Sequence, residues 1–199
     1  MTMPTSPPEA QAGSTVAHRF VARLAGLAER EDRGALAALR RSLGQEPGTV
    51  AEACAIVEPF LGEDASSRRV RAFYLVGGLF GLHPEYRDGA GRVSFGDSLR
   101  AIRLHEGTDD EDSGVERRFR AVLDARQEGL EVHLRNLVKL LHSRKPDVPI
   151  DYVQLIRDLE HWDDADPRVK RRWASGFWGR RHDATVAESP TTAADTESD

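Results

Sequence analysis

The chain has 199 residues, a formal net charge of −5, and a composition that is 39% hydrophobic and 31% charged. This length is enough to bury a real core in one domain or in two small ones. No stretch approaches the ~18 consecutive apolar residues of a membrane-spanning helix. Cys54 is the only cysteine, which excludes an internal disulfide and argues against a cysteine-based zinc site. The N-terminus lacks the basic start and apolar centre of a secretory signal, so we expect a cytoplasmic protein.

The acidic residues are concentrated in two short segments. Residues 106–112 and residues 183–199 each contain five acidic residues and no lysine or arginine. Without these ten negative charges the formal charge changes from −5 to +5. The rest of the chain is therefore basic, although the net charge of the whole chain is negative.

Apolar residues at helical spacing predict that the first third of the chain is helical. Residues 1–13 are rich in Pro, Ser and Thr and are expected to be disordered. The first helix is expected to run from Ser14 to about Glu31, and the second from Arg33 to Leu43. Thr49 followed by Glu52 has capping-box spacing and predicts a third helix that continues through Val57.

The most apolar helix of the chain is expected to begin behind a cap at Ser66 or Ser67 and to end at Leu82. Its later turns are hydrophobic on nearly every side, which predicts a place in the centre of the fold. Three glycines lie inside it, where they indicate close helix packing and not a dinucleotide-binding loop. These are Gly77, Gly78 and Gly81.

The first turn of that helix carries Arg68, Arg69 and Arg71. Cations at this end oppose the helix dipole, where Asp or Glu would be favoured. Residues that violate a local structural preference without an evident structural gain are enriched at functional sites. We therefore predict a partner for these arginines.

Ser94 is expected to cap the next helix, which reaches Leu104 and carries Arg100 and Arg103 outward. The acidic loop at residues 107–113 follows. It lacks the alternating ligands, the turn glycine and the late bidentate Glu of an EF-hand, so we interpret it as a solvated loop.

Residues 113–145 combine apolar residues at helical spacing with basic residues on the intervening faces. Ser113 and Glu116 have capping-box spacing and predict a helix start. The low helix propensity of glycine predicts a break within residues 126–129, with Asp124 and Gln127 as a possible cap for a second helix.

The second of these helices has two distinct faces. Its leucines form one apolar stripe, while Arg135 and Lys139 repeat on another face. Residues 116–145 hold eight basic residues against four acidic ones. A charged helix face is most often only solvated surface, so this excess alone leaves that alternative open.

Two further helices complete the pattern. Asp151 is expected to cap a helix that reaches Trp162, and Asp166 with Pro167 is expected to start a last helix that reaches Trp178. Lys170, Arg171 and Arg172 lie near the start of the last helix. No segment has the alternation of a strand and no repeat emerges, so the prediction is all-α, a compact bundle of about eight or nine helices.

The sequence shows no pattern of catalytic or metal-binding residues, and we predict no enzyme, cofactor or metal site. The seven histidines are scattered and never form the H-x-x-x-H spacing of a helical zinc site. His161 precedes Asp163 and Asp164, which at a helix end is typical of capping. Arginine is the remaining candidate for a functional residue, because its planar guanidinium group binds phosphate oxygens bidentately and stays charged at physiological pH.

Six segments, taken in order, resemble the CasB family, the small subunit of the type I-E CRISPR surveillance complex Cascade. The similarity covers roughly Phe20 to Trp178. The segments are 73–84 (FYLVGGLFGLHP), 92–100 (RVSFGDSLR), 116–126 (ERRFRAVLDAR), 134–141 (LRNLVKLL), 150–162 (IDYVQLIRDLEHW) and 171–178 (RRWASGFW).

This resemblance implies a non-catalytic, all-helical protein of two small halves, present twice in the complex and contacting its other subunits. It also implies basic surfaces that hold the displaced DNA strand and support guide RNA and target strand in an R-loop. Because R-loop formation is nearly balanced energetically, modest protein contacts can favour it. We expect one helical domain at residues 14–179, between tails at 1–13 and 180–199 whose composition predicts disorder.

The nucleic-acid-binding candidates are the basic residues at positions that match the family. They are Arg68, Arg69, Arg71, Arg117, Arg118, Arg135, Lys139, Lys170, Arg171 and Arg172. Arg100 and Arg103 could equally face a partner copy. The large apolar residues of the same segments are assigned to the core, namely Phe119, Leu134, Leu137, Trp162 and Trp173.

Two hypotheses follow from these residues. The first is a structural Cascade subunit that binds nucleic acid without sequence specificity. The alternative is a helical adaptor whose basic face docks an acidic partner protein, for example residues 106–112 of a second copy.

Overall fold

The structure is a computed structural model that describes the backbone of residues 8–87, 93–105, 114–144 and 147–179, and their side chains except at 8–15 and 103–105. Within these ranges it contains nine α-helices, a short 3-10 helix and no strand, so the all-α prediction is confirmed. One isolated parallel bridge joins Tyr86 and Ile150. The helices are α1 (Pro8–Glu29), α2 (Arg33–Ser42), α3 (Ala51–Val57), η1 (Glu58–Phe60), α4 (Ser67–Leu82), α5 (Phe95–His105), α6 (Gly114–Asp124), α7 (Gln127–His142), α8 (Tyr152–Glu160) and α9 (Arg168–Trp178).

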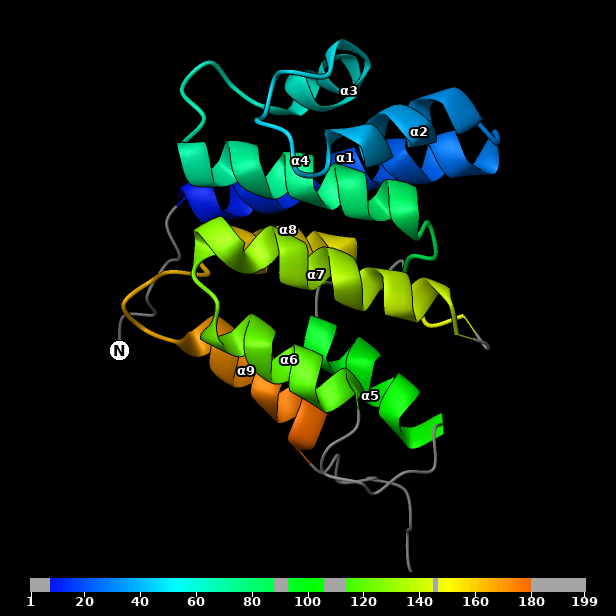
Figure 1. Cartoon of the computed structure of the whole chain (residues 1–199). Coiled ribbons are helices and arrows are strands. Elements are labelled where there is room, and N and C mark those ends of the chain that lie inside the picture. Colours follow the sequence, from blue (N-terminus) through cyan, green and yellow to red (C-terminus); the bar gives the residue numbers. More distant parts are fainter. Residues whose placement is uncertain (1–7, 88–92, 106–113, 145–146, 180–199) are drawn as a thin grey trace, which may run out of the picture.

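The helices form three tiers in Figure 1. The first four helices and η1 lie at the top, α5, α6 and α9 lie at the bottom, and α7 and α8 lie between them. The middle tier joins the other two, because α8 packs on α1 and α4 while α7 packs on α4 and α6. None of the described helices is long and apolar enough to cross a bilayer.

The central helix α4 packs closely against α2, as its glycines predict. A Cβ atom added at Gly78 would lie 2.5 Å from Leu43 Cδ2, and one added at Gly81 would lie 2.8 Å from the Leu36 carbonyl oxygen. Neither distance is compatible with a real Cβ atom, so the two glycines permit the approach of the two helices. Phe73 and Phe80 on the same helix are fully buried.

One continuous cluster of buried side chains runs through all three tiers. The five residues assigned to the core from the sequence belong to it, so that assignment is confirmed. They are Phe119, Leu134, Leu137, Trp162 and Trp173, with exposed fractions of 2% or less. The rings of Trp162 and Trp173 meet with centroids 4.9 Å apart, which ties the end of α8 to α9.

Several helix starts follow the local signals in the sequence. The Ser66 hydroxyl accepts a hydrogen bond from the Arg69 amide, and the Asp151 carboxylate accepts one from the Gln154 amide at 2.8 Å. Ser94 makes reciprocal bonds with Asp97 across the start of α5. These caps satisfy backbone donors that the helix itself leaves unpaired.

Other helix starts differ from the prediction. Helix α1 begins at Pro8 and not at Ser14, so it includes residues that we expected to be disordered. Proline suits a first helical position because its φ is fixed and it has no amide hydrogen to leave unpaired. The capping box predicted at Thr49 is wrong, because the Thr49 hydroxyl donates to the Glu46 carbonyl while Glu52 pairs with Arg41.

The two helices predicted within residues 113–145 are confirmed, but the predicted cap of the second is wrong. The Gln127 amide donates to Asp163 Oδ2 at 3.1 Å, so the capping carboxylate comes from the loop after α8 and not from Asp124. Helix α9 starts one residue later than predicted, and Asp166 binds the side chain of Arg168 instead of capping the helix. The proposed cap at residue 113, the acidic loop and both tails beyond residues 8 and 179 lie outside the described residues.

Candidate nucleic-acid interface

The arginines in the first turn of α4 have partners within the protein. Arg68 Nη1 lies 2.9 Å from Asp164 Oδ1, and Arg69 Nη1 lies 3.1 Å from Glu160 Oε1. The Arg69 guanidinium also lies 4.9 Å from the centroid of the Phe73 ring. Carboxylates at the end of α8 therefore compensate cations that the α4 dipole disfavours.

The pairing of Arg69 with Glu160 is the more enclosed of the two. Burial raises the pKa of the Glu160 carboxyl, and the nearby Arg69 charge opposes that rise. The Arg68 pair is half-exposed, with side-chain exposures of 50% and 41%, so water screens it and it contributes little to stability. Arg68 therefore remains accessible to a further ligand.

Arg71 is exposed and has no hydrogen-bond or ion-pair partner among the described residues. It lines a groove of about 220 Å³ between α4, α7 and the turn after α2. The same groove exposes Glu46, Glu128 and Glu131. The groove is therefore lined by both acidic and basic side chains, and Arg71 is the basic one.

The basic face of α7 is compensated in part. Arg135 Nη2 lies 2.5 Å from Glu131 Oε1, one turn earlier on the helix. The guanidinium also lies against Gly44, which has φ of +81°, and a Cβ atom there would lie 2.8 Å from Arg135 Nη2. Arg135 is thus held half-buried, whereas Lys139 is exposed and has no partner in the described part of the chain.

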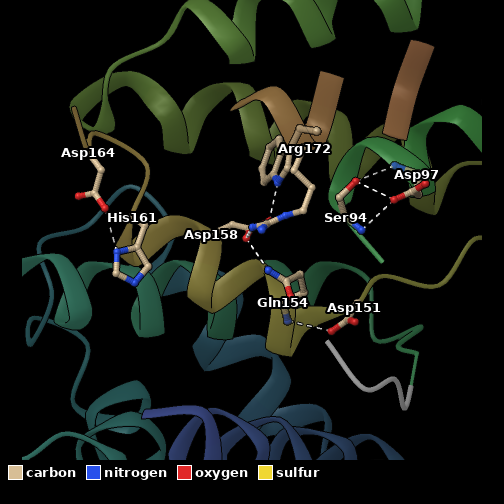
Figure 2. A network of polar contacts seen from close by, with 9 residues as sticks. Ser94, Asp97, Asp151, Gln154, Asp158, His161, Asp164 and Arg172 are labelled. Carbon is tan, nitrogen blue, oxygen red and sulfur yellow. Dashed lines mark hydrogen bonds and ion pairs between the residues drawn. The ribbon is translucent and has the colours of Figure 1, made fainter. Parts of the chain in front are cut away.

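A buried carboxylate organises the start of α9. Asp158 on α8 accepts hydrogen bonds from Arg172, from Trp173 Nε1 at 2.5 Å and from Gln154 Nε2 at 2.6 Å, as Figure 2 shows for Gln154 and Arg172. Burial raises the pKa of Asp158, and the bonds from Trp173 and Arg172 oppose that rise. Arg172 keeps 44% of its side chain exposed while bound to Asp158.

The other two basic residues of α9 differ from each other. Lys170 Nζ donates to the Ala125 carbonyl at 3.1 Å and lies 5.0 Å from the centroid of a Trp162 ring. It therefore ties α9 to the turn between α6 and α7. The Arg171 side chain is exposed and has no hydrogen-bond or ion-pair partner among the described residues.

The candidates on α6 lie toward the other end of α9. Arg117 is exposed without a partner in the described residues, and Arg118 donates to the Gly114 carbonyl of its own helix at 2.7 Å. Their neighbour Phe119 packs on Phe177 with centroids 4.4 Å apart. Phe177 follows Lys170 by about two helical turns, so the α6 and α9 candidates are separated along the lower tier.

The ten candidate residues thus fall into three groups. Four bind carboxylates, two bind backbone carbonyls, and four have no partner among the described residues. The last group is Arg71 of α4, Arg117 of α6, Lys139 of α7 and Arg171 of α9. We call these four residues the unpaired cations.

Arg100 differs from the expectation that it points outward. Its Nη1 donates to the Gly179 carbonyl and its Nε is buried without a partner, so the side chain is directed to the end of α9. The side chain of Arg103 lies outside the described residues. Sequence reasoning also missed Trp178, whose side chain is 38% exposed. A tryptophan at the last residue of an amphipathic helix is a signal that could have identified it.

The fold and these side chains define a small all-helical protein with exposed cations on four helices. Among the described residues no group of three or more His, Cys, Asp or Glu could hold a metal ion. Residues 35–178 match the family model of the CRISPR-associated protein Cse2, and the chain belongs to this family.

Comparisons with individual proteins agree with the family model. The chain is 36% identical to CRISPR-associated protein Cse2 of Thermus thermophilus over 146 residues, which are 73% of this chain and 79% of that protein. The crystal structure of CasB from Thermus thermophilus is 30% identical, with a TM-score of 0.66 over 82% of this chain and 98% of that one. A chain of a CRISPR RNA-guided surveillance complex is 28% identical, with a TM-score of 0.65 over 83% and 92%. The resemblance to CasB is therefore confirmed.

Proposed function

We propose that this chain is a non-catalytic structural subunit of a type I-E CRISPR Cascade complex that binds nucleic acid without reading its sequence and stabilises the R-loop. Its ligands are guide RNA, target DNA and the displaced single strand, and its protein partners are the other Cascade subunits and a second copy. The same proposal implies a cytoplasmic protein. Family membership and the similarity to a chain of a surveillance complex support this assembly.

The observation that carries the nucleic-acid part of the proposal is the set of unpaired cations. Arg71, Arg117, Lys139 and Arg171 come from four helices and are exposed. An exposed cation without a carboxylate partner attracts phosphate at little desolvation cost, and each contact releases condensed counterions. Such contacts position a polynucleotide and carry no sequence information.

Two of the ion-paired arginines can also contact phosphate, to a smaller degree. Arg68 and Arg172 each bind one carboxylate and keep about half of the side chain exposed. A guanidinium has five N–H donors, so one carboxylate leaves donors for a phosphate. Arg69 and Arg135 are more enclosed, and we assign them mainly to holding α4 and α7 in place.

A pair of charge-matched variants tests the proposal. Arg117→Gln with Arg171→Gln removes two unpaired cations, and Arg23→Gln with Arg40→Gln removes two exposed cations of α1 and α2 outside the candidate set. The plot of log K against log salt for single-stranded DNA has a negative slope. We expect the first variant to make this slope less steep by about 1.4, because each lost contact reduces its magnitude by ~0.7. The second should leave the slope unchanged. Equal effects of both variants would show that net charge alone, and not this surface, governs binding.

The adaptor hypothesis stays a prediction, because its acidic partner segment lies outside the described residues. It differs from the proposal in a measurable way. An adaptor would lose self-association, and not DNA affinity, when residues 106–112 are reversed in charge.

A further inference from the structure

Trp178 is the tryptophan of this chain that solvent reaches. Its side chain is 38% exposed, whereas Trp162 and Trp173 are exposed by 2% or less. It ends α9, beside α6 in the lower tier of Figure 1. Its exposed surface is therefore available to a ligand.

The indole is held in a fixed orientation by three contacts. Its Nε1 donates to Glu116 Oε1 at 3.1 Å, and its ring lies 5.2 Å from the Phe119 ring and 5.1 Å from the Phe177 ring, centroid to centroid. The interplanar angles are 56° and 89°, so neither phenyl ring lies parallel to the indole. The polar edge is therefore satisfied by the protein, and neither of these rings covers an indole face by parallel stacking.

Two arginines bind groups next to this ring. Glu116 Oε1 also accepts from Arg120 Nη2 at 2.6 Å, so the guanidinium and the indole nitrogen share one acceptor atom. Arg120 is 59% exposed, while Glu116 is 5% exposed and its charge is taken up by these bonds. Arg100 donates to the carbonyl of Gly179, the residue that follows Trp178. Among the described residues, the indole of Trp178 and the guanidinium of Arg120 are thus the exposed groups of this contact.

We propose that Trp178 is a stacking platform for one unpaired base of single-stranded nucleic acid, with Arg120 placed for the adjacent phosphate. This inference rests on the proposed function and specifies the ligand of its α6–α9 end. Every base has a π face, so stacking on an indole tolerates any sequence, while paired bases inside a duplex are not available to it. A rigid ring with its N–H already bonded loses little conformational entropy on binding.

Nucleic acid fits the Trp178 site better than a protein surface does. The buried core of a protein interface is depleted in charged residues, whereas the exposed guanidinium of Arg120 shares the acceptor atom of this indole. Alternating base and phosphate groups at close spacing match an aromatic face next to a cation.

Three ligands separate stacking from charge in a test with the full chain. They are an oligothymidylate, an oligomer of equal length whose nucleotides are abasic, and a duplex of the same length. We expect Trp178→Ala to weaken oligothymidylate binding by about tenfold and to leave the abasic oligomer and the duplex unchanged. Trp178→Phe keeps an aromatic face and should retain most of the affinity.

Tryptophan fluorescence of the wild-type chain provides a measurement that does not depend on how well Trp178→Ala folds. Because Trp162 and Trp173 are buried, quenching by a stacked base reports Trp178. We expect oligothymidylate to quench the emission, the abasic oligomer to bind without quenching, and Trp178→Phe to abolish the quenching.

The outcomes distinguish this inference from the proposed function. Salt-dependent binding to all three ligands that Trp178→Ala leaves unchanged would overturn the stacking site and leave the proposed function standing. A loss of self-association with unchanged affinity for oligothymidylate would assign Trp178 to a protein interface and overturn it as well. Absence of binding to every ligand at low salt would overturn the proposed function and the stacking site together.

Discussion

Replacing Asp158 by alanine should destabilise the protein more than the loss of any exposed ion pair. The Asp158 side chain has no exposed surface and accepts bonds from Trp173, Gln154 and Arg172. Alanine removes all three acceptor contacts at once. The Arg172 side chain, 44% exposed, can turn to water, but the buried Trp173 indole cannot.

The magnitude follows from the donors that lose their acceptor. A buried donor without a partner costs about 1–3 kcal/mol. Trp173 is 0% exposed and carries this cost in full, while Gln154 is 6% exposed and carries part of it. We therefore expect a loss of about 3 kcal/mol in the free energy of unfolding. For a chain of this length that corresponds to a fall in Tm of about 6–12 °C.

Urea unfolding followed by circular dichroism measures this loss, and Asp164→Ala is the matched control. Asp164 pairs with Arg68 and His161, both exposed, so its removal should cost less than about 1 kcal/mol. Combining Asp158→Ala with Trp173→Phe should shrink the added cost of the alanine, because the indole donor is already absent. If Asp158→Ala costs no more than Asp164→Ala, Asp158 does not serve these buried donors.

Further predictions concern pH and glycine. Burial raises the pKa of the Asp151 carboxyl in the folded protein. The contribution of this carboxyl to the free energy of unfolding is therefore fully present below its pKa in the unfolded chain, and it is lost as pH rises through its pKa in the folded protein. Asp151→Asn keeps the α8 cap and removes a buried charge. It should therefore raise the free energy of unfolding at neutral pH, with a gain that shrinks on acidification; a gain that is constant with pH would refute this cause. Gly129 on α7 has no atom within 4 Å of an added Cβ, so Gly129→Ala should stabilise by about 0.5–1 kcal/mol. Gly81→Ala should destabilise by about 1–3 kcal/mol, since backbone atoms of α2 block the added atom; equal melting temperatures of the two variants would contradict both.

The sequence predicted the parts of the fold that depend on neighbours along the chain. Caps such as Ser66 and Asp151 act three residues away, and the glycines of α4 mark a close contact whatever the partner is. The Thr49 capping box failed because a hydroxyl can bond a carbonyl in the preceding turn as readily as an amide in the next one. The local sequence therefore shows which hydrogen bonds a side chain can form, but not which of them it forms in the folded protein.

The candidate site was less predictable because its carboxylates come from distant segments. Arg68 pairs with a residue 96 positions later and Arg69 with one 91 positions later. Both arginines violate the helix-dipole preference, from which we predicted a functional partner; the structure instead pairs each of them with a carboxylate of the same chain. Arg71, two residues further on, shares the sequence signal and has no partner in the described residues. Only the three-dimensional arrangement of α4, α7 and α8 separates these cases.

The central claim is that exposed cations bind nucleic acid through its phosphates and without reading its bases. The most direct test measures the affinity of the wild-type chain for two single-stranded DNAs of equal length and unrelated sequence across a salt series. We expect equal affinities for the two strands at each salt concentration and a steep, linear fall of log K with log salt. Affinities that differ between the strands, or that do not change with salt, would contradict the claim.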